Sequence, residues 1–297
     1  MRKASTLLLA LALASTVAVA VPAQDKSADA TRPRFTQAST NVFRRFAVDL
    51  AKMKEFYGDV LGLGALPAIG MPGGGQMTRF HAGTTEVKLQ SSAAETQAPS
   101  GAIRDVIGLR VLTFFFPDQA ALAARFKEHG LPSPDFFPKA GGTSSTAMVT
   151  DPSGQWVELV VMPGAPPATF DKIEIGLTVS DIEKSRVFYH DFVGLDELEP
   201  VMDARLGATR YPFRLGTTTI NVWSFGRSAP VNTTSAGIQY VVVNVEEVDA
   251  RAKARHIKID RPLGNFSAGL RTVWLSDPDG ITNYFAQVAG RQEIATR

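Results

Sequence analysis

The chain has 297 residues, of which 44% are hydrophobic, with 31 Lys and Arg against 29 Asp and Glu and no cysteine. This length and composition allow two ordinary hydrophobic cores. The near balance of charge excludes the basic stripe of a nucleic-acid-binding protein and a polybasic lipid-binding segment. The lack of cysteine excludes disulfides, thiolate metal sites and cysteine nucleophiles.

The first residues are typical of a secretory signal peptide. Arg2 and Lys3 precede an apolar run over 7–21, and small residues offer a cleavage site between Ala20 and Ala23. The run is too short, and too rich in Ala, Ser and Thr, for a membrane span. We therefore expect residues 1–23 to be removed and the mature protein to be periplasmic or secreted, with no stable membrane span.

The rest of the chain repeats itself. Residues 49–63 return as residues 181–195 with seven identities at an offset of 132 residues, and Asp-Pro-x-Gly sequences begin at Asp151 and Asp277. Two copies in the same order indicate a duplicated domain. The predicted boundaries are a flexible leader over 24–39, a first domain over 40–163, a linker over 164–170, a second domain over 171–290 and a tail over 291–297.

Taken in chain order, the elements of each copy follow one scheme of strand, helix and two or three antiparallel strands. In the second copy, apolar residues alternate over 173–179 as in a half-buried strand, and a capping box at Ser180–Glu183 opens a helix that Gly194 ends. Asp-Pro-x-Gly closes a hairpin because Asp caps the backbone, Pro presets a dihedral angle and Gly accepts a left-handed conformation. The other expected strands are 107–116, 146–150, 156–161, 211–214, 220–223, 238–245, 272–275 and 282–287, and the other expected helices are 118–128 and 246–255.

These marks resemble the vicinal oxygen chelate superfamily, which includes glyoxalase I, bleomycin resistance proteins and extradiol dioxygenases. The resemblance lies in the Asp-x6-Phe-Tyr-x4-Gly-Leu-like segments at 49–63 and 181–195 and in Asp-Pro-x-Gly-x3-Glu at Asp151–Glu158. It implies an α+β fold of four βαβββ modules, paired into two glyoxalase-like domains whose sheets curl into cups around a small ligand. In the enzymes of the family, a divalent metal in the cup is held by residues of the first and last strands.

The resemblance also implies which residues face the cups. Counting seven residues back from the helix-opening Asp gives Val42 and Glu174, and counting seven forward from the turn Asp gives Glu158 and Tyr284. Less certain positions, where a register slip of one residue changes the face, are Lys88, Asn221, Arg110 or Leu112, and Tyr240 or Gln239.

Grouped by half, each cup would hold only one carboxylate and no histidine, which a metal site of this family would need. We therefore predict no cofactor. A divalent metal, if one binds, would be held by Glu158 or Glu174. Both residues are candidate catalytic groups, because an apolar cup can raise the pKa of a carboxyl group that acts as a general base. An ion pair of Glu158 with Lys88 or Arg110 is the competing interpretation. The expected ligand-binding residues are Asn221, Tyr240, Tyr284, Lys88 and Arg110.

Three function classes remain open. The favoured one is an exported protein that binds or transforms a small molecule in its cup without the usual metal. The second is a metal-dependent lyase, isomerase or dioxygenase, and the third is a structural or partner-binding protein. Whether the protein is an enzyme is left open. If it is, a glyoxalase-like lyase or isomerase fits better than an extradiol dioxygenase, because the histidines of an iron site are missing at the family positions. Either a monomer or a homodimer is expected.

Overall fold

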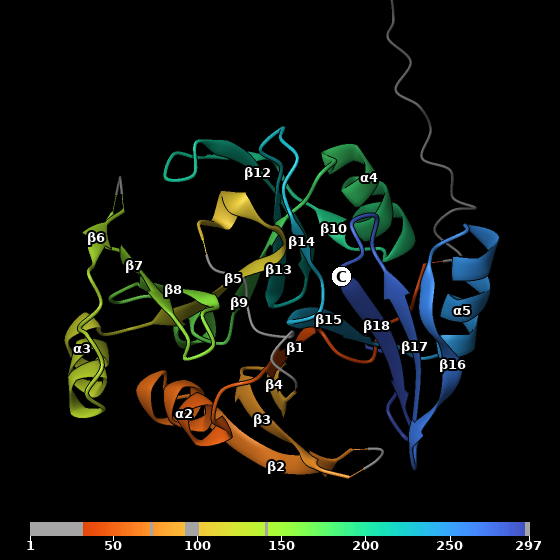
Figure 1. Ribbon diagram of the computed structural model, residues 1–297, viewed down its shortest axis with the longest axis horizontal. Helices are drawn as coiled ribbons and strands as arrows, with labels where there is room; N and C mark the ends of the chain where they lie inside the picture. The colour runs from red at the N-terminus through yellow and green to blue at the C-terminus, as the bar shows by residue number, and fades with distance from the viewer. Residues whose placement is uncertain (1–31, 72–73, 93–100, 140–141, 295–297) are drawn as a thin grey trace, which may run out of the picture. The chain divides into compact units, whose positions relative to one another are not determined.

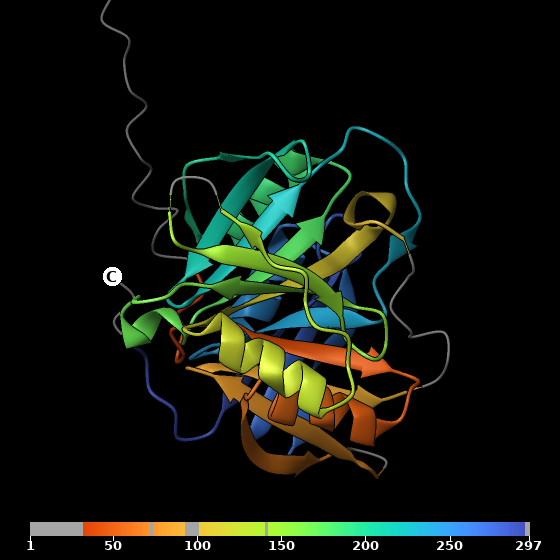
Figure 2. The same ribbon diagram turned by 90° about the vertical axis from the view of Figure 1, so that its left-hand side faces the viewer.

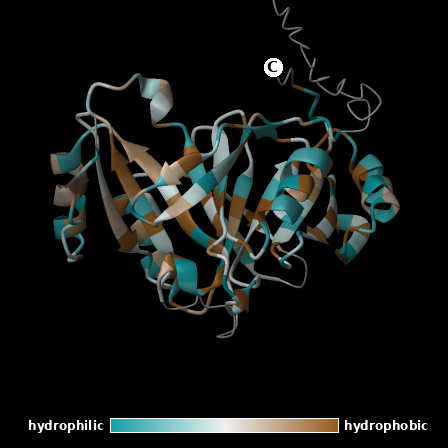
Figure 3. Ribbon diagram, turned by 90° about the horizontal axis from the view of Figure 1, so that it is seen from above, coloured by the Kyte–Doolittle hydropathy of each residue, from teal (hydrophilic) through white to brown (hydrophobic). Residues whose placement is uncertain are grey.

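Each quarter of the chain folds as strand, helix and further antiparallel strands, in agreement with the α+β scheme expected from the sequence (Figure 1). The computed structural model describes residues 32–71, 74–92, 101–139 and 142–294. The expected signal peptide and its cleavage site lie outside these residues. Figure 3 shows hydrophobic residues concentrated along the strands and hydrophilic residues frequent on the helices.

Four modules account for most of these elements. Module 1 comprises β1 (Asn41–Phe46), α2 (Leu50–Lys54), the π-helical segment η1 (Glu55–Val60), β2 (Gly64–Gly70), β3 (Gln76–Ala82) and β4 (Thr85–Ser91). Module 2 comprises β5 (Ile107–Phe116), α3 (Gln119–Glu128), β6 (Phe137–Pro138), β7 (Ser145–Thr150) and β8 (Trp156–Val161). Module 3 comprises β9 (Ile173–Thr178), α4 (Ile182–Arg186), the π-helical segment η5 (Val187–Phe192), β10 (Asp196–Glu197), β11 (Val201–Asp203), β12 (Ala208–Leu215) and β13 (Thr218–Trp223). Module 4 comprises β15 (Ala236–Val241), α5 (Val245–Ala254), β16 (Ile259–Ser267), β17 (Leu270–Ser276) and β18 (Thr282–Val288). Three short connecting elements complete the fold: η3 (Ile103–Asp105), η4 (Pro167–Thr169) and β14 (Val231–Asn232).

Neither sheet is made by one half of the chain alone. An eight-stranded sheet has the order β16-β17-β18-β15-β1-β4-β3-β2, so it joins modules 4 and 1 through the antiparallel pair β1 and β15. A ten-stranded sheet has the order β10-β12-β13-β9-β5-β8-β7-β6, with β11 paired to β12 and β14 paired to β5 outside this order. It joins modules 3 and 2 through β5 and β9. We call the concave face of the first sheet cup I and that of the second cup II. The expected grouping of cup residues by half is therefore wrong.

Modules of the same half instead pack through their helical faces (Figure 2). In the first half, Phe56 of η1 meets Phe126 of α3 edge to face, and Tyr57 lies against Phe114 of β5. In the second half, Phe192 of η5 packs in the same way on Phe285 of β18. These rings belong to one main hydrophobic cluster that contains residues of all four modules. Helix-to-sheet packing within a half and strand pairing between halves therefore build the core together.

The leader expected over 24–39 does not extend as far as predicted. Phe35 is buried and bridges to Val242, and Ser39 is also buried. The tail contacts the same segment, because Arg291 donates a hydrogen bond to Gln37 at 3.2 Å. Residues 32–39 are thus part of the packed fold, since their apolar and polar groups find partners on module 4.

Candidate functional site

Strand pairing defines four equivalent inward-facing positions in each cup. In cup II, Thr113 of β5 lies opposite both Glu158 of β8 and Glu174 of β9, and Asn221 of β13 follows on the next strand. In cup I, the pairing of the equivalent strands gives Gln239, Tyr284, Asn41 and Lys88 in that order. The structure therefore brings Glu158 and Glu174 into one cup. Grouping by halves predicted Glu158 in one cup and Glu174 in the other.

The position expected at Val42 falls instead on Asn41. Val42 is fully buried in the hydrophobic core. Two residues separate Phe46, at the end of β1, from the helix-opening Asp49, whereas the second copy has only one residue between the equivalent positions 179 and 181. Counting back from the Asp therefore slips by one residue, and a one-residue slip exchanges the two faces of a strand.

Glu158 lies at the centre of a closed set of hydrogen bonds in cup II. Thr113 Oγ1 donates to Glu158 Oε2 at 3.0 Å, Thr146 Oγ1 donates to Oε1 at 2.9 Å, and Arg205 Nη1 lies 2.8 Å from Oε1. Burial would raise the pKa of Glu158, but the charge of Arg205, aided by Lys139 and the two hydroxyl groups, lowers it below the ordinary value. Glu158 is thus an ionised group at neutral pH.

Glu174 has fewer hydrogen-bonding partners than Glu158, and its pKa shifts in the opposite direction. Asn221 Nδ2 donates to Glu174 Oε2 at 2.6 Å, and Arg210 Nη1 lies 3.7 Å from the same oxygen. Burial raises the pKa of Glu174, the nearby charge of Glu158 raises it further, and Arg210 offsets only part of this. Its side chain is still 26% exposed, so a proton can enter or leave. The two carboxyl groups therefore differ in their tendency to hold a proton.

A cavity of about 1100 Å³ opens in front of these groups. Glu158 and Arg210 line it, whereas Glu174 is not one of its lining residues and meets Arg210 at 3.7 Å. Three of the five large apolar side chains that are exposed among the described residues stand on its walls: Phe137 of β6, and Val201 and Met202 of β11. The cavity thus combines an apolar entrance with a charged floor. Its other lining residues are Asp135, Pro138, Lys139, Thr146, Ala147, Met148, Trp156, Asp203, Ala204 and Arg205.

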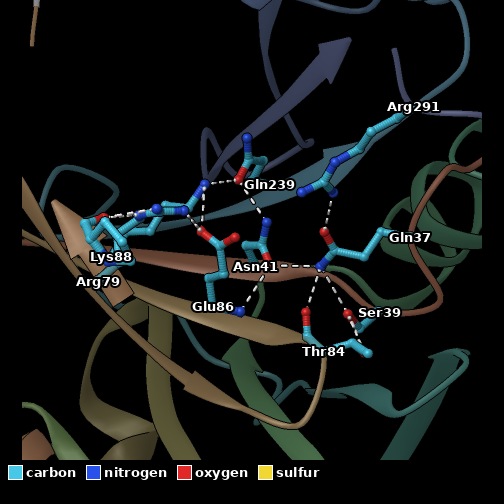
Figure 4. Close-up of polar contacts among 10 residues, drawn as sticks. Gln37, Ser39, Asn41, Arg79, Thr84, Glu86, Lys88, Gln239 and Arg291 are labelled. Carbon is cyan, nitrogen blue, oxygen red and sulfur yellow. Dashed lines mark hydrogen bonds and ion pairs between the residues drawn. The ribbon is translucent and has the colours of Figure 1, made fainter. Parts of the chain in front are cut away.

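Cup I carries an amide and lysine network (Figure 4). Asn41 Nδ2 and Lys88 Nζ both donate to Oε1 of Gln239, and Lys88 lies 3.4 Å from Glu86. Arg79 also pairs with Glu86, at 3.1 Å. Burial lowers the pKa of Lys88, whereas the charges of Lys88 and Arg79 overcome burial and hold the pKa of Glu86 below its ordinary value. Lys88 therefore pairs with Glu86 in cup I, and the suggested ion pair between Lys88 and Glu158 does not form.

The remaining expected residues are divided between cup and core. Tyr284 faces cup I and stacks on Trp274, with ring centroids 4.4 Å apart. Tyr240 is fully buried on the other face, where its hydroxyl donates to Asn283 at 3.1 Å, so its neighbour Gln239 takes the cup position. Arg110 occupies a bulge in β5 and donates to the carbonyl oxygens of Gly101 and Ala102. It is not among the residues that line the cup II cavity.

Sequence reasoning missed the two arginines of cup II. Arg205 lies in the turn between β11 and β12, and Arg210 lies on β12, which pairs with β13 in the sheet. The repeat does not indicate them, because the residue of the first copy that matches Arg210 is Met77. The local signal is Asp203-Ala-Arg205, in which Arg205 also pairs with Asp203 at 3.5 Å.

Comparison with known proteins agrees with this architecture. The family model of the Glyoxalase/Bleomycin resistance protein/Dioxygenase superfamily matches residues 40–159 and 170–285. The chain belongs to this superfamily. Its fold is similar to that of a mutant of glyoxalase I from Zea mays (TM-score 0.69, 20% identity, covering 88% of this chain and 96% of that one). It is also similar to a putative dioxygenase from Bacillus subtilis (TM-score 0.61, 16% identity, covering 87% of this chain and 86% of that one). Curated protein sequences gave no match.

The divalent metal that the superfamily implies does not fit the residues of either cup. In cup II each of the two carboxylates has an arginine beside it, and the other two positions are Thr113 and Asn221. In cup I the four positions hold two amides, a phenol and a lysine. An arginine or lysine opposes a cation, and neutral amides and hydroxyls are weak ligands for Zn, Fe or Ni. Within the described ranges, no three His, Cys, Asp or Glu side chains gather as a metal would require.

The helices of the described part of the chain are all too short or too polar to cross a membrane.

Proposed function

We propose that this superfamily member binds an apolar small molecule in cup II and exchanges a proton with it through Glu174, without a divalent metal. One observation carries the proposal. Glu158 and Glu174 flank Thr113 in neighbouring strands, yet their surroundings shift their pKa values in opposite directions. A pair of carboxyl groups separated in this way is the usual arrangement for an acid and base with distinct roles.

The two groups would act differently. Ionised Glu158 holds Arg205 at the cavity wall, where the guanidinium can bind a ligand oxygen. Once Arg210 moves away from its 3.7 Å contact, Glu174 would remove a proton from a carbon beside a carbonyl group, which leaves an enolate, and would return that proton to the carbonyl oxygen, which gives the enol. This sequence moves one proton within the ligand and leaves the carboxyl group as it began, so it is a keto–enol isomerisation. The apolar entrance formed by Phe137 and Met202 favours a ligand with an aromatic or aliphatic body.

Proton exchange tests the role of Glu174. Phenylacetone, an apolar ketone, would be incubated with protein in D2O, and loss of its C–H signals next to the carbonyl would be followed by NMR. We expect exchange faster than in buffer, at least tenfold slower exchange in Glu174→Gln, and little change in Asp279→Asn, which removes a carboxylate outside the cup. Equal exchange rates in the wild-type protein and Glu174→Gln would refute the proposed role.

Metal content separates the proposal from its metal-dependent alternative. Elemental mass spectrometry of the wild-type protein, Glu158→Gln and Glu174→Gln should find no stoichiometric divalent metal in any of them. Stoichiometric metal that is lost in either variant would replace the acid–base proposal by a metal-dependent lyase, isomerase or dioxygenase.

We also propose that the protein is exported, with residues 1–23 removed. Support comes from Arg2 and Lys3 before the apolar run over 7–21. N-terminal sequencing of protein from a periplasmic or culture-medium fraction should find a start between residues 21 and 24. A protein that keeps Met1 in the cytosolic fraction would exclude this proposal.

A further inference from the structure

An aromatic floor runs across cup I, opposite in character to the charged floor of cup II. Tyr284 stacks on Trp274 with ring centroids 4.4 Å apart and 10° between the planes, and Phe43 meets both rings at 5.5 and 5.8 Å. Phe266 continues the row at 6.3 Å from Trp274. Phe43 reaches these rings only because β15 has Gly237 beneath it, where a Cβ would lie 2.3 Å from Phe43 Cζ.

Two arginines cover this floor. The guanidinium carbon of Arg45 lies 5.0 Å from the centre of the Phe43 ring and 5.7 Å from that of Trp274. The guanidinium carbon of Arg261 lies 5.0 Å from the centre of the Trp274 ring. Both cations are attracted to the negative faces of the rings. A guanidinium that interacts through its flat face keeps the N–H groups at its edge available for other partners.

Neither arginine has an anionic partner among the described residues. The other cations of this cup do, because Arg79 and Lys88 both pair with Glu86. Arg45 has one long side-chain hydrogen bond, of 3.5 Å to the carbonyl oxygen of Thr234. Burial lowers the pKa of Arg45, and the charge of Arg261 lowers it further, which places the two positive charges within each other's field. Two like charges held together in this way favour an anion between them.

The hydroxyl group of Tyr284 belongs to the same aromatic floor of cup I. Tyr284 is 6% exposed as a residue, and its hydroxyl is not among the buried polar atoms that lack a partner in the described part of the chain. The hydroxyl therefore reaches the surface of the cup, where water or a ligand can form a hydrogen bond with it. Arg45 is one of the two charges that act on this phenol, the other being Glu86. Both side chains also contact the same ring, because the Arg45 guanidinium carbon lies 5.0 Å from the centre of the Phe43 ring and the Tyr284 ring centre lies 5.5 Å from it. The phenol and Arg45 can therefore share a ligand.

A small cavity of about 140 Å³ lies beside Arg261, and its lining residues do not include Arg45 or Tyr284. Arg261 and Phe266 line it, together with Pro262, Gly264, Asn265 and Thr272 of the bulged strand β16 and its partner β17. Its volume is well below the roughly 300–1,000 Å³ typical of pockets for drug-sized ligands. It suits a small anionic group of a few heavy atoms.

From these contacts we infer that Arg45, Arg261 and Tyr284 form an oxyanion-binding site in cup I, which takes a small carboxylate or phosphate. The edge of a guanidinium matches either anion with two parallel hydrogen bonds. The Tyr284 hydroxyl would donate a further bond to the anion. This site is separate from the proposed proton-exchange site in cup II, and neither depends on the other.

Fluorescence of Trp274 tests the site. In a Trp156→Phe background, which removes the indole of the cup II cavity and leaves the buried Trp223 as a constant contribution, the protein would be titrated with sodium benzoate and, separately, with inorganic phosphate at constant ionic strength. We expect saturable changes in emission with at least one anion. Arg261→Gln and Arg45→Gln should each weaken binding about tenfold or more, and Tyr284→Phe should weaken it less. The ratio of the two affinities tells carboxylate from phosphate recognition.

Arg104→Gln is the matched control, because Arg104 also lies over an aromatic ring, that of Phe225 at 5.9 Å, but outside cup I. It should bind both anions as the parent does, and circular dichroism should show each variant folded. Two results would overturn the inference. One is the absence of saturable binding of either anion, and the other is equal weakening by Arg104→Gln and Arg261→Gln.

Discussion

The two Asp-Pro-x-Gly turns have the same sequence pattern and the same backbone bonds but different partners. Asp151 and Asp277 each accept backbone N–H groups of their own turn and the hydroxyl of a buried tyrosine, Tyr57 or Tyr189. Asp151 also pairs with the fully buried Arg44 at 3.1 Å. The strand pairing places Leu177 of β9 where β1 has Arg44, so the second copy lacks the equivalent of this cation.

This difference shows that a duplicated fold can keep the residue that caps a turn while the charges around that residue change. The capping role of the Asp is kept in both copies because the hairpin requires it. Only the first copy neutralises the buried carboxylate by an ion pair. In the second, burial raises the pKa of Asp277 to about 7, so near neutral pH this carboxyl group is partly protonated. The cups differ in a parallel way, with carboxylates in cup II where cup I has Asn41 and Tyr284.

Replacing Asp151 by Asn should have the largest effect. Arg44 would keep its full burial and lose its counter-charge, and breaking a buried ion pair from one side costs about 3–5 kcal/mol. The free energy of unfolding from urea denaturation should fall by this amount at every pH between about 5 and 8. Asp118→Asn, at an exposed helix cap, serves as a control and should lose no more than about 1 kcal/mol. A loss at Asp151 no larger than this would mean that the pair with Arg44 contributes little.

Replacing Asp277 by Asn should instead raise the free energy of unfolding at pH 7–8. The folded-state pKa of about 7 lies above the unfolded value of about 3.9, so the stability that Asp277 contributes is complete below about pH 4 and is lost as pH rises to about 7. This loss is on the order of 4 kcal/mol. In Asp277→Asn the introduced amide cannot ionise, its oxygen can accept both backbone N–H groups, and its nitrogen can donate to Tyr189.

Urea denaturation between pH 4 and pH 8 measures this effect. Asp277→Asn should be more stable than the wild-type protein at pH 7–8, and its stability should fall less as pH rises. Asp118→Asn, at the exposed N-cap of α3, should keep the wild-type pH dependence. If Asp277→Asn is less stable than wild type at pH 8, Asp277 is ionised and stabilised in a way that the contacts of the turn do not account for.

These turns also show what the sequence could and could not predict. The repeat and the hairpins follow from local patterns, because turn chemistry and strand alternation act over a few residues. The inward positions expected for Glu158 and Glu174 came from the family resemblance. The pairing of modules between halves does not follow from local patterns, since similar repeats leave open which strand edges meet. The extra residue before the first helix shifts the count by one, so Val42 lies in the core where a cup residue was expected. The register of β15 likewise places Gln239 in the cup and Tyr240 in the core. The pairing of Glu158 with Arg205 joins modules 2 and 3, so the sequence around Arg205 does not indicate that this arginine meets Glu158.

Each cup has a glycine beneath an aromatic ring, and replacing these glycines should have a smaller effect on stability. A Cβ at Gly237 would lie 2.3 Å from Phe43 and 2.7 Å from the backbone oxygen of Thr282, and one at Gly176 would lie 2.6 Å from Trp223. Overpacking of this kind costs about 1–3 kcal/mol. Gly237→Ala should fall at the upper end, because a backbone atom cannot move away as readily as a ring. Thermal denaturation measures both, and Gly70→Ala, which would meet no atom within 4 Å, should change little.

The ends of the equivalent helices α3 and α5 should give the smallest effect. Both helices are followed by a left-handed residue, which is Gly130 (φ 66°) after α3 and His256 (φ 54°) after α5. A side chain in this conformation costs about 1 kcal/mol, which glycine avoids. His256→Gly should therefore raise the free energy of unfolding by up to about 1 kcal/mol, and Gly130→Ala should lower it by a similar amount. If His256→Gly is destabilising instead, the imidazole contributes more through its contacts than its backbone costs, and the wall of the cavity that it forms with Ile257 and Lys258 becomes the place to look for that contact.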